Sequence, residues 1–151
     1  FGVNWPDVGY FGEHTDKLNN FQLLLADRSD IGAGDFDIYF IYGQIQWETG
    51  DASGGSGGLG GSCAAAGFSN GTGDPGTNFE IAGSHVCGAL IDGGADQLIT
   101  ATNDGVPGQF LFEVRNGHVV PPPSTPEPAS LALLGTGLAG LLLLRRRSKT
   151  A

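Results

Sequence analysis

The chain has 151 residues, 27 of them glycine, and sixteen acidic side chains against seven basic ones give a formal net charge of −9. Fifteen of the acidic residues but only three of the basic ones precede position 120. That part of the chain therefore lacks the basic surface that nucleic-acid binding requires, so nucleic acid is excluded as a partner. About 120 residues form one domain with a single core and are too few for two.

Apolar residues alternate with polar ones in several short segments of this first part, which is the pattern of strands with one face in a core. Strands are expected at 35–42, 44–47 and 109–115, with shorter candidates at 21–25 and 78–81. The side chains expected to face the core are Phe36, Ile38, Phe40, Tyr42, Ile45, Trp47, Phe110, Phe112 and Val114.

No stretch before Ala129 has a convincing helical period, and glycine- and aspartate-rich segments such as 29–34 and 103–108 supply turn residues between the strands. Strands joined by such turns pair antiparallel. The predicted fold is mostly β, an antiparallel β-sandwich-like domain.

The C-terminal segment has a different character. Residues 129–144 carry no charge, and as a helix they would span about 24 Å, slightly less than a bilayer core of about 30 Å. A basic cytoplasmic stop follows at Arg145, Arg146, Arg147 and Lys149. This charge bias predicts a single transmembrane helix with its end in the cytoplasm and the preceding domain on the far side of the membrane.

Pro126-Glu127-Pro128, the apolar run and the basic end together closely resemble the PEP-CTERM sorting signal of Gram-negative bacteria. The resemblance implies export, a transient stay in the inner membrane, processing by exosortase near this motif, and delivery to the cell surface or an exopolysaccharide-rich matrix. The alternative is a plain C-terminal anchor that is never cleaved.

The expected organisation has three parts. Residues 1–119 form the β domain, 120–128 a stiff proline-rich linker that contains the sorting motif, and 129–151 the transmembrane sorting helix with its basic tail. Since export needs an N-terminal signal and the sequence begins at Phe1 without a methionine, a leader is expected upstream of it.

A second resemblance covers about residues 10–117. The segments Asn20–Leu25, Tyr42–Trp47, the acidic glycine-rich loop after Trp47, Ala66-Gly67-Phe68 and the turn 105–108 before 110–114 resemble, in this order, the NIDO (nidogen-like) domain. Its hosts are matrix, cell-surface and adhesive proteins, and membership implies no enzymatic activity.

Cys63 and Cys87 are the two cysteines of the chain and do not belong to the shared pattern of that domain. An even count in an exported domain favours a disulfide, which would contribute about 3 kcal/mol in the chain-entropy model. A zinc site is not expected, because His85 alone does not complete the ligand shell.

Four aspartates, Asp27, Asp30, Asp35 and Asp37, lie within eleven residues around a glycine turn. Converging carboxylates are what Ca²⁺ prefers, so they are the weak candidates for a calcium site. Their spacing matches no calcium-binding repeat. The preferred interpretation makes Asp27 and Asp30 turn residues and places Asp35 and Asp37 on the solvent face of a strand.

Hydrolase patterns are not convincing. The segment 54–58 has the form G-x-S-x-G, but neither a following helix nor parallel βα units can be read around it. His14, His85 and His118 have no paired aspartate in a known triad context. We therefore expect no enzymatic activity and no cofactor.

The function expected is a non-enzymatic adhesion or matrix-interaction domain, with exosortase and exopolysaccharide or other matrix proteins as partners. A carbohydrate-binding or calcium-dependent recognition module is an alternative, in which Trp47, Tyr42 and the acidic loop would be exposed. A further alternative is the non-catalytic part of a larger secreted hydrolase.

Overall fold

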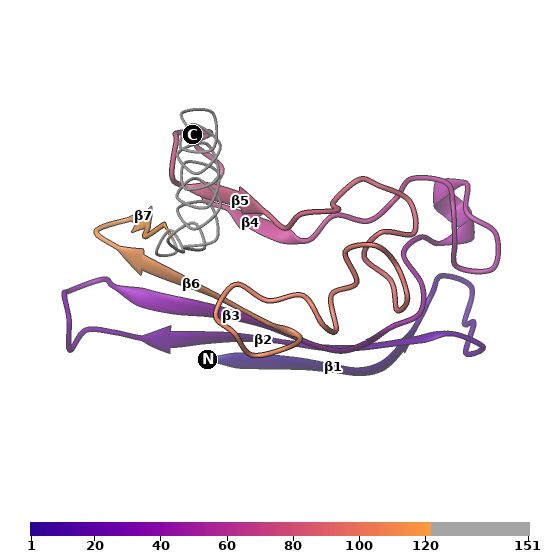
Figure 1. Ribbon diagram of the computed structural model, residues 1–151, viewed down its shortest axis with the longest axis horizontal. Helices are drawn as coiled ribbons and strands as arrows, with labels where there is room; N and C mark the ends of the chain where they lie inside the picture. Colours follow the sequence, from indigo (N-terminus) through magenta and orange to yellow (C-terminus); the bar gives the residue numbers. More distant parts are fainter. Residues whose placement is uncertain (122–151) are drawn as a thin grey trace, which may run out of the picture.

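A computed structural model describes residues 1–121, which fold as antiparallel β-structure (Figure 1). A five-stranded sheet has the order β1-β2-β3-β6-β7, and a two-stranded sheet is formed by β4 and β5. The strands are β1 (Gly2–Gly9), β2 (Leu18–Asp27), β3 (Phe36–Ile45), β4 (Gly67–Ser69), β5 (Asn78–Glu80), β6 (Gln109–Arg115) and β7 (His118–Val119). The described residues also contain one short 3-10 helix, η1 (Asp51–Ser53).

The two layers are unequal. The β4–β5 pair and the long connections around it lie over one face of the larger sheet (Figure 1). The antiparallel β class is confirmed, but the second layer of the expected sandwich is made mostly of loops. Within residues 1–121 no helix is long and apolar enough to cross a membrane. Of the linker expected at 120–128, residues 122–128 lie outside the described residues, as does the whole helix expected at 129–151.

The core lies between the larger sheet and the layer that covers it. Ile38, Phe110, Phe112 and Val114 reach it from β3 and β6, as the alternation predicts. The covering layer adds Ile81, at the end of the shorter candidate 78–81, and Leu90 and Leu98, which no periodic pattern in the sequence had indicated. Phe112 is the centre of an aromatic cluster, with ring centroids 4.7 Å from Phe79, 5.1 Å from Phe68 and 5.9 Å from Phe40.

A β-bulge explains why the inward residues of β3 change from even to odd numbers. Phe21 pairs with Tyr42 and Asn20 pairs with Gln44, so Gly43 is the extra residue. An inserted residue moves every later side chain to the other face. Tyr42 and Ile45 consequently face the same side, and Ile45 is buried in the core as expected.

Candidate functional site

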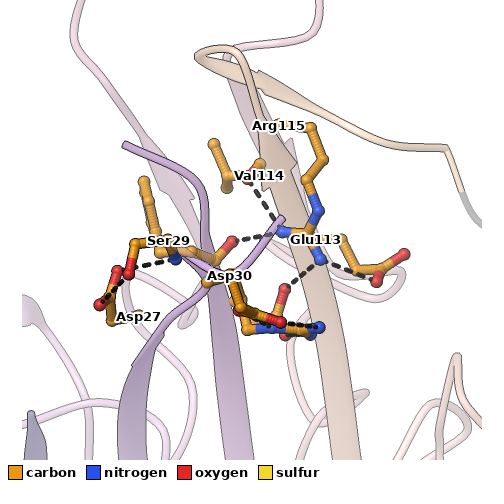
Figure 2. A network of polar contacts seen from close by, with 9 residues as sticks. Asp27, Ser29, Asp30, Glu113, Val114 and Arg115 are labelled. Atoms are coloured by element: carbon orange, nitrogen blue, oxygen red, sulfur yellow. Dashed lines mark hydrogen bonds and ion pairs between the residues drawn. The ribbon is translucent and has the colours of Figure 1, made fainter. Parts of the chain in front are cut away.

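Two arginines meet at Asp37, near the start of β3. Arg28 comes from the β2–β3 turn and Arg115 from the end of β6. Asp37 is only 2% exposed, and its two carboxylate oxygens form ion pairs of 2.7 Å with Nη1 of Arg28 and Nη2 of Arg115. The same arginines pair with Asp30 and Glu113 at 3.1 and 3.0 Å. Figure 2 shows Arg115 and Glu113 on the β6 ribbon beside the turn that carries Ser29 and Asp30.

The other two aspartates hold the turn itself. The Asp27 carboxylate accepts hydrogen bonds from the backbone N–H and the hydroxyl of Ser29, at 3.1 and 2.8 Å (Figure 2). Asp35 accepts the backbone N–H of Asn116 at 2.9 Å and thereby ties the turn to the one between β6 and β7. The expectation that Asp35 and Asp37 face solvent was wrong, because partners from distant parts of the chain cover both of them.

The pKa of Asp37 shows that its pairing with the arginines has a larger effect than its burial. Burial alone would raise this pKa, but hydrogen bonds and charges from Arg28 and Arg115 outweigh burial and hold it below its ordinary value. The carboxylate is therefore ionised at neutral pH and neutralised by the arginines. Among the described residues the four aspartates do not gather their oxygens within 4.8 Å of one another, so the cluster has the geometry of a structural ion-pair network, not of a calcium site.

The disulfide predicted between Cys63 and Cys87 is confirmed, with the two Cα atoms 5.0 Å apart. The carboxylate of Glu48 lies beside it and accepts the backbone N–H of Gly88 at 2.9 Å. These three residues bring metal-ligand atoms together, but both sulfurs are in the disulfide and cannot act as thiolate ligands. The group fixes the start of the covering layer above the sheet.

The segment from Ala64 to Gly67, which follows the disulfide, forms one wall of a pocket of about 340 Å³. The opposite wall is the inner face of β1, β2 and β3. We call this feature the aromatic pocket, because five aromatic rings line it. Its sheet-side and loop-side residues include Trp5, Phe21, Leu23, Phe40, Tyr42, Ile45, Trp47, Leu90 and Leu98, with Asn19, Gln22 and Glu48 as the polar members.

Asn19 and Trp47 line the aromatic pocket and are held in place by hydrogen bonds. Asn19 is 6% exposed, and its side-chain amide donates to the Trp47 carbonyl at 2.9 Å while its oxygen accepts the N–H groups of Gln46 and Trp47. The indole N–H of Trp47 in turn donates to the Val8 carbonyl at 2.8 Å. Trp47 and Tyr42, expected in the core, are thus half-buried residues of the pocket wall.

The histidines do not form a nucleophile–base pair. His14 stacks on Tyr10 and lies 3.4 Å from Asp51, and His85 contacts Glu80. Within residues 1–121 no serine hydroxyl is hydrogen-bonded to a histidine ring, which nucleophilic activation of serine requires.

The sequence gives no periodic signal for the aromatic pocket. The run of three alanines after Cys63 is the one signal that could have indicated it, because such small side chains leave space beside them.

A disulfide is typical of domains that fold in an oxidising environment such as the outside of the cell. Comparison with known proteins agrees: residues 1–116 match the Nidogen-like domain and residues 124–147 match the PEP-CTERM protein-sorting motif. The chain belongs to the nidogen-like domain family.

Individual relatives support the same conclusion. The chain is 33% identical to Alpha-tectorin of Gallus gallus over 138 residues, 37% identical to Alpha-tectorin of Homo sapiens over 125, and 36% identical to Nidogen of Drosophila melanogaster over 114. These alignments cover 89%, 80% and 74% of this chain but only 6%, 5% and 7% of the relatives. No solved structure matches.

The two family matches together define the chain as an extracellular nidogen-like protein with a PEP-CTERM sorting signal, which implies processing by exosortase. The residues assigned to that signal, Pro126 to Pro128 and Arg145 to Lys149, lie outside the described residues, as does the predicted boundary at 128 and 129.

Proposed function

We propose that this protein is displayed at the cell surface or in the extracellular matrix after exosortase processing, and that its nidogen-like domain acts in adhesion or matrix interaction without catalysis. The observation that supports the proposal is the order of the two matches, a nidogen-like domain at 1–116 followed by a sorting motif at 124–147. Residues 129–144 would hold the chain in the inner membrane until cleavage near Pro126-Glu127-Pro128 releases it.

The alternatives have less support. Ca²⁺-dependent recognition would need free carboxylates, whereas Asp37 and Asp30 are paired with arginines. Glycan binding would need several uncommitted polar groups beside the aromatic rings, but Asn19 and Glu48 already bond to the backbone. Membership in a family whose hosts, by the resemblance above, are adhesive and matrix proteins supports a non-enzymatic role.

Replacement of Glu127 by alanine tests the sorting step. In a Gram-negative host with exosortase, Glu127→Ala should remain in the inner membrane, because the processing enzyme would no longer recognise the motif. Fractionation followed by immunoblotting measures this. The matched control is Glu80→Ala, the same chemical change on an exposed strand of the domain, which should be released like the wild type. Normal release of Glu127→Ala would sink the sorting assignment.

A further inference from the structure

We infer that the aromatic pocket is a binding site for a small, uncharged, mostly apolar ring compound that carries a hydrogen-bond acceptor. This goes beyond the proposed function, because neither sorting nor display requires a ligand in the domain. The failure of either inference would leave the other standing.

The walls favour an apolar ligand. At about 340 Å³ the pocket falls at the lower end of the range for small-molecule sites. Trp5 stacks on Phe21 at 5.1 Å on the sheet side, with Tyr42 adjoining Phe21 at 6.5 Å, so the sheet presents a continuous aromatic surface. Apolar surface of this kind gains free energy when a ligand removes it from water.

The alanine wall keeps the pocket open. Ala64, Ala65 and Ala66 fill little space, and their backbone is fixed from outside the pocket: the Ala64 carbonyl accepts the His85 N–H at 2.9 Å and the Ala66 carbonyl accepts the Ile81 N–H at 2.8 Å. The disulfide at Cys63 fixes the start of the same segment. Because the wall is fixed at both ends, it does not collapse onto the sheet and the space is preformed.

The polar groups of the pocket restrict the class of ligand further. Asn19, Trp47 and Glu48 use their polar atoms within the protein. The Tyr42 hydroxyl, by contrast, makes no hydrogen bond to another group among residues 1–121, and neither does the side-chain amide of Gln22, the remaining polar residue of the lining. Burial raises the pKa of Tyr42 to about 12, so this group stays a neutral donor across the physiological range. A neutral donor beside apolar walls suits a carbonyl or ether oxygen on an uncharged ring.

The chain provides its own reporters, because Trp5 and Trp47 are its only two tryptophans and both line the pocket. We would titrate the full chain in lipid nanodiscs with 1-acetonaphthone, a neutral ring ketone, and follow tryptophan quenching. Saturable quenching is expected. Ala65→Leu, which adds bulk at the wall, should weaken binding at least tenfold, whereas Ala95→Leu, the same change at an exposed alanine outside the pocket, should bind like the wild type. Partition of the probe into lipid affects all variants equally.

A second variant tests the hydroxyl and does not depend on the folding of Ala65→Leu. Tyr42→Phe should weaken 1-acetonaphthone binding about two- to tenfold, the effect of one lost hydrogen bond. It should leave the rise in melting temperature caused by 1-ethylnaphthalene, which lacks the carbonyl, unchanged. Quenching that does not saturate, equal binding by Ala65→Leu and Ala95→Leu, or equal effects of Tyr42→Phe on both probes would overturn the inference.

Discussion

At the scale of single residues, Asp37 is the most constrained charged group that the structure describes. It lies under two arginines from different elements, one in the β2–β3 turn and one at the end of β6. A buried charge is tolerated in such a position when it is paired with opposite charges, but removal of one partner leaves the others without compensation. The network therefore makes the position of the turn depend on β6.

Asp37→Asn should destabilise the protein by about 3 kcal/mol, because Arg28 and Arg115 would lose their buried partner. Urea unfolding at pH 7 measures the change in the free energy of unfolding. Glu113→Gln, which alters an ion pair at an exposed carboxylate, should cost less than about 1 kcal/mol. Equal effects of the two substitutions would mean that the burial of Asp37 has no energetic consequence.

The same residue predicts a pH dependence. The pKa of Asp37 is lower in the folded protein than in the unfolded chain, so the unfolded chain takes up the proton first as the pH falls. The contribution of the ion pairs is complete above about pH 4 and is lost as the pH falls through the pKa of the folded state. The wild type should lose stability more steeply below pH 4 than Asp37→Asn does. Parallel curves for the two proteins would contradict the assignment.

Residue patterns predicted the side on which Asp35 and Asp37 lie but not their burial. Alternation places both aspartates on the face of the strand that points away from Phe36 and Ile38, and that assignment agrees with the structure. What the pattern could not show is that Arg115, 78 positions further along the chain, covers Asp37 from a neighbouring strand. Burial that depends on a distant partner leaves no local periodic signal.

At the scale of elements, predictability depends on regular alternation. The expected segments 35–42 and 109–115 correspond to β3 and β6, whose neighbours on both sides keep them regular. β1 was not expected, because Pro6 and Asp7 interrupt its pattern. The structure explains how the strand continues there: its register with β2 shifts between Trp5 and Val8, and Asp7 takes a φ of 52°. The register shift lets β1 continue past Pro6 and Asp7, where the alternation in the sequence is interrupted.

Asn103 bonds to the part of β6 that the short strand β7 does not reach. Its amide donates to the Leu111 carbonyl and its oxygen accepts the Leu111 N–H, both at 2.8 Å. Asn103→Ala should lower the free energy of unfolding by about 1–3 kcal/mol, since it leaves two backbone groups of the strand unpaired. Thermal unfolding measures the loss, and Asn4→Ala on the exposed face of β1 is the control. A loss no larger than that of the control would show that water replaces the amide.

The disulfide stabilises the covering layer as an element. The double variant Cys63→Ser/Cys87→Ser should be about 3 kcal/mol less stable, because the unfolded chain is no longer constrained across a separation of 24 residues. Denaturant unfolding with and without a reductant measures this: the wild type should fall to the stability of the variant under reduction. A midpoint for the wild type that does not respond to reduction would contradict the prediction.

At the scale of the whole molecule, the fold class could be predicted from sequence and the second layer could not. The strands of the main sheet have a period, whereas Leu90 and Leu98 reach the core from connections without regular structure. The pocket between the two layers has no periodic signal in the sequence for the same reason. The sorting motif, in contrast, could be identified from the sequence alone, because it is defined by the order of its residues and not by a tertiary arrangement.

The molecule therefore combines a nidogen-like domain with a separate sorting motif. The chain spans 5–7% of the length of the relatives considered, so their whole-protein roles do not transfer with the domain. The nidogen-like domain is the part that contains the aromatic pocket, and the C-terminal segment is the part that matches the sorting motif.

The measurement that tests the central claim most directly is the intact mass and location of the mature protein in a Gram-negative host with and without exosortase. We predict loss of the segment after about Pro126, together with release to the surface or medium, only where exosortase is present. Full-length protein held in the inner membrane in both strains would mean that the C-terminal segment is a simple anchor, and would contradict the account.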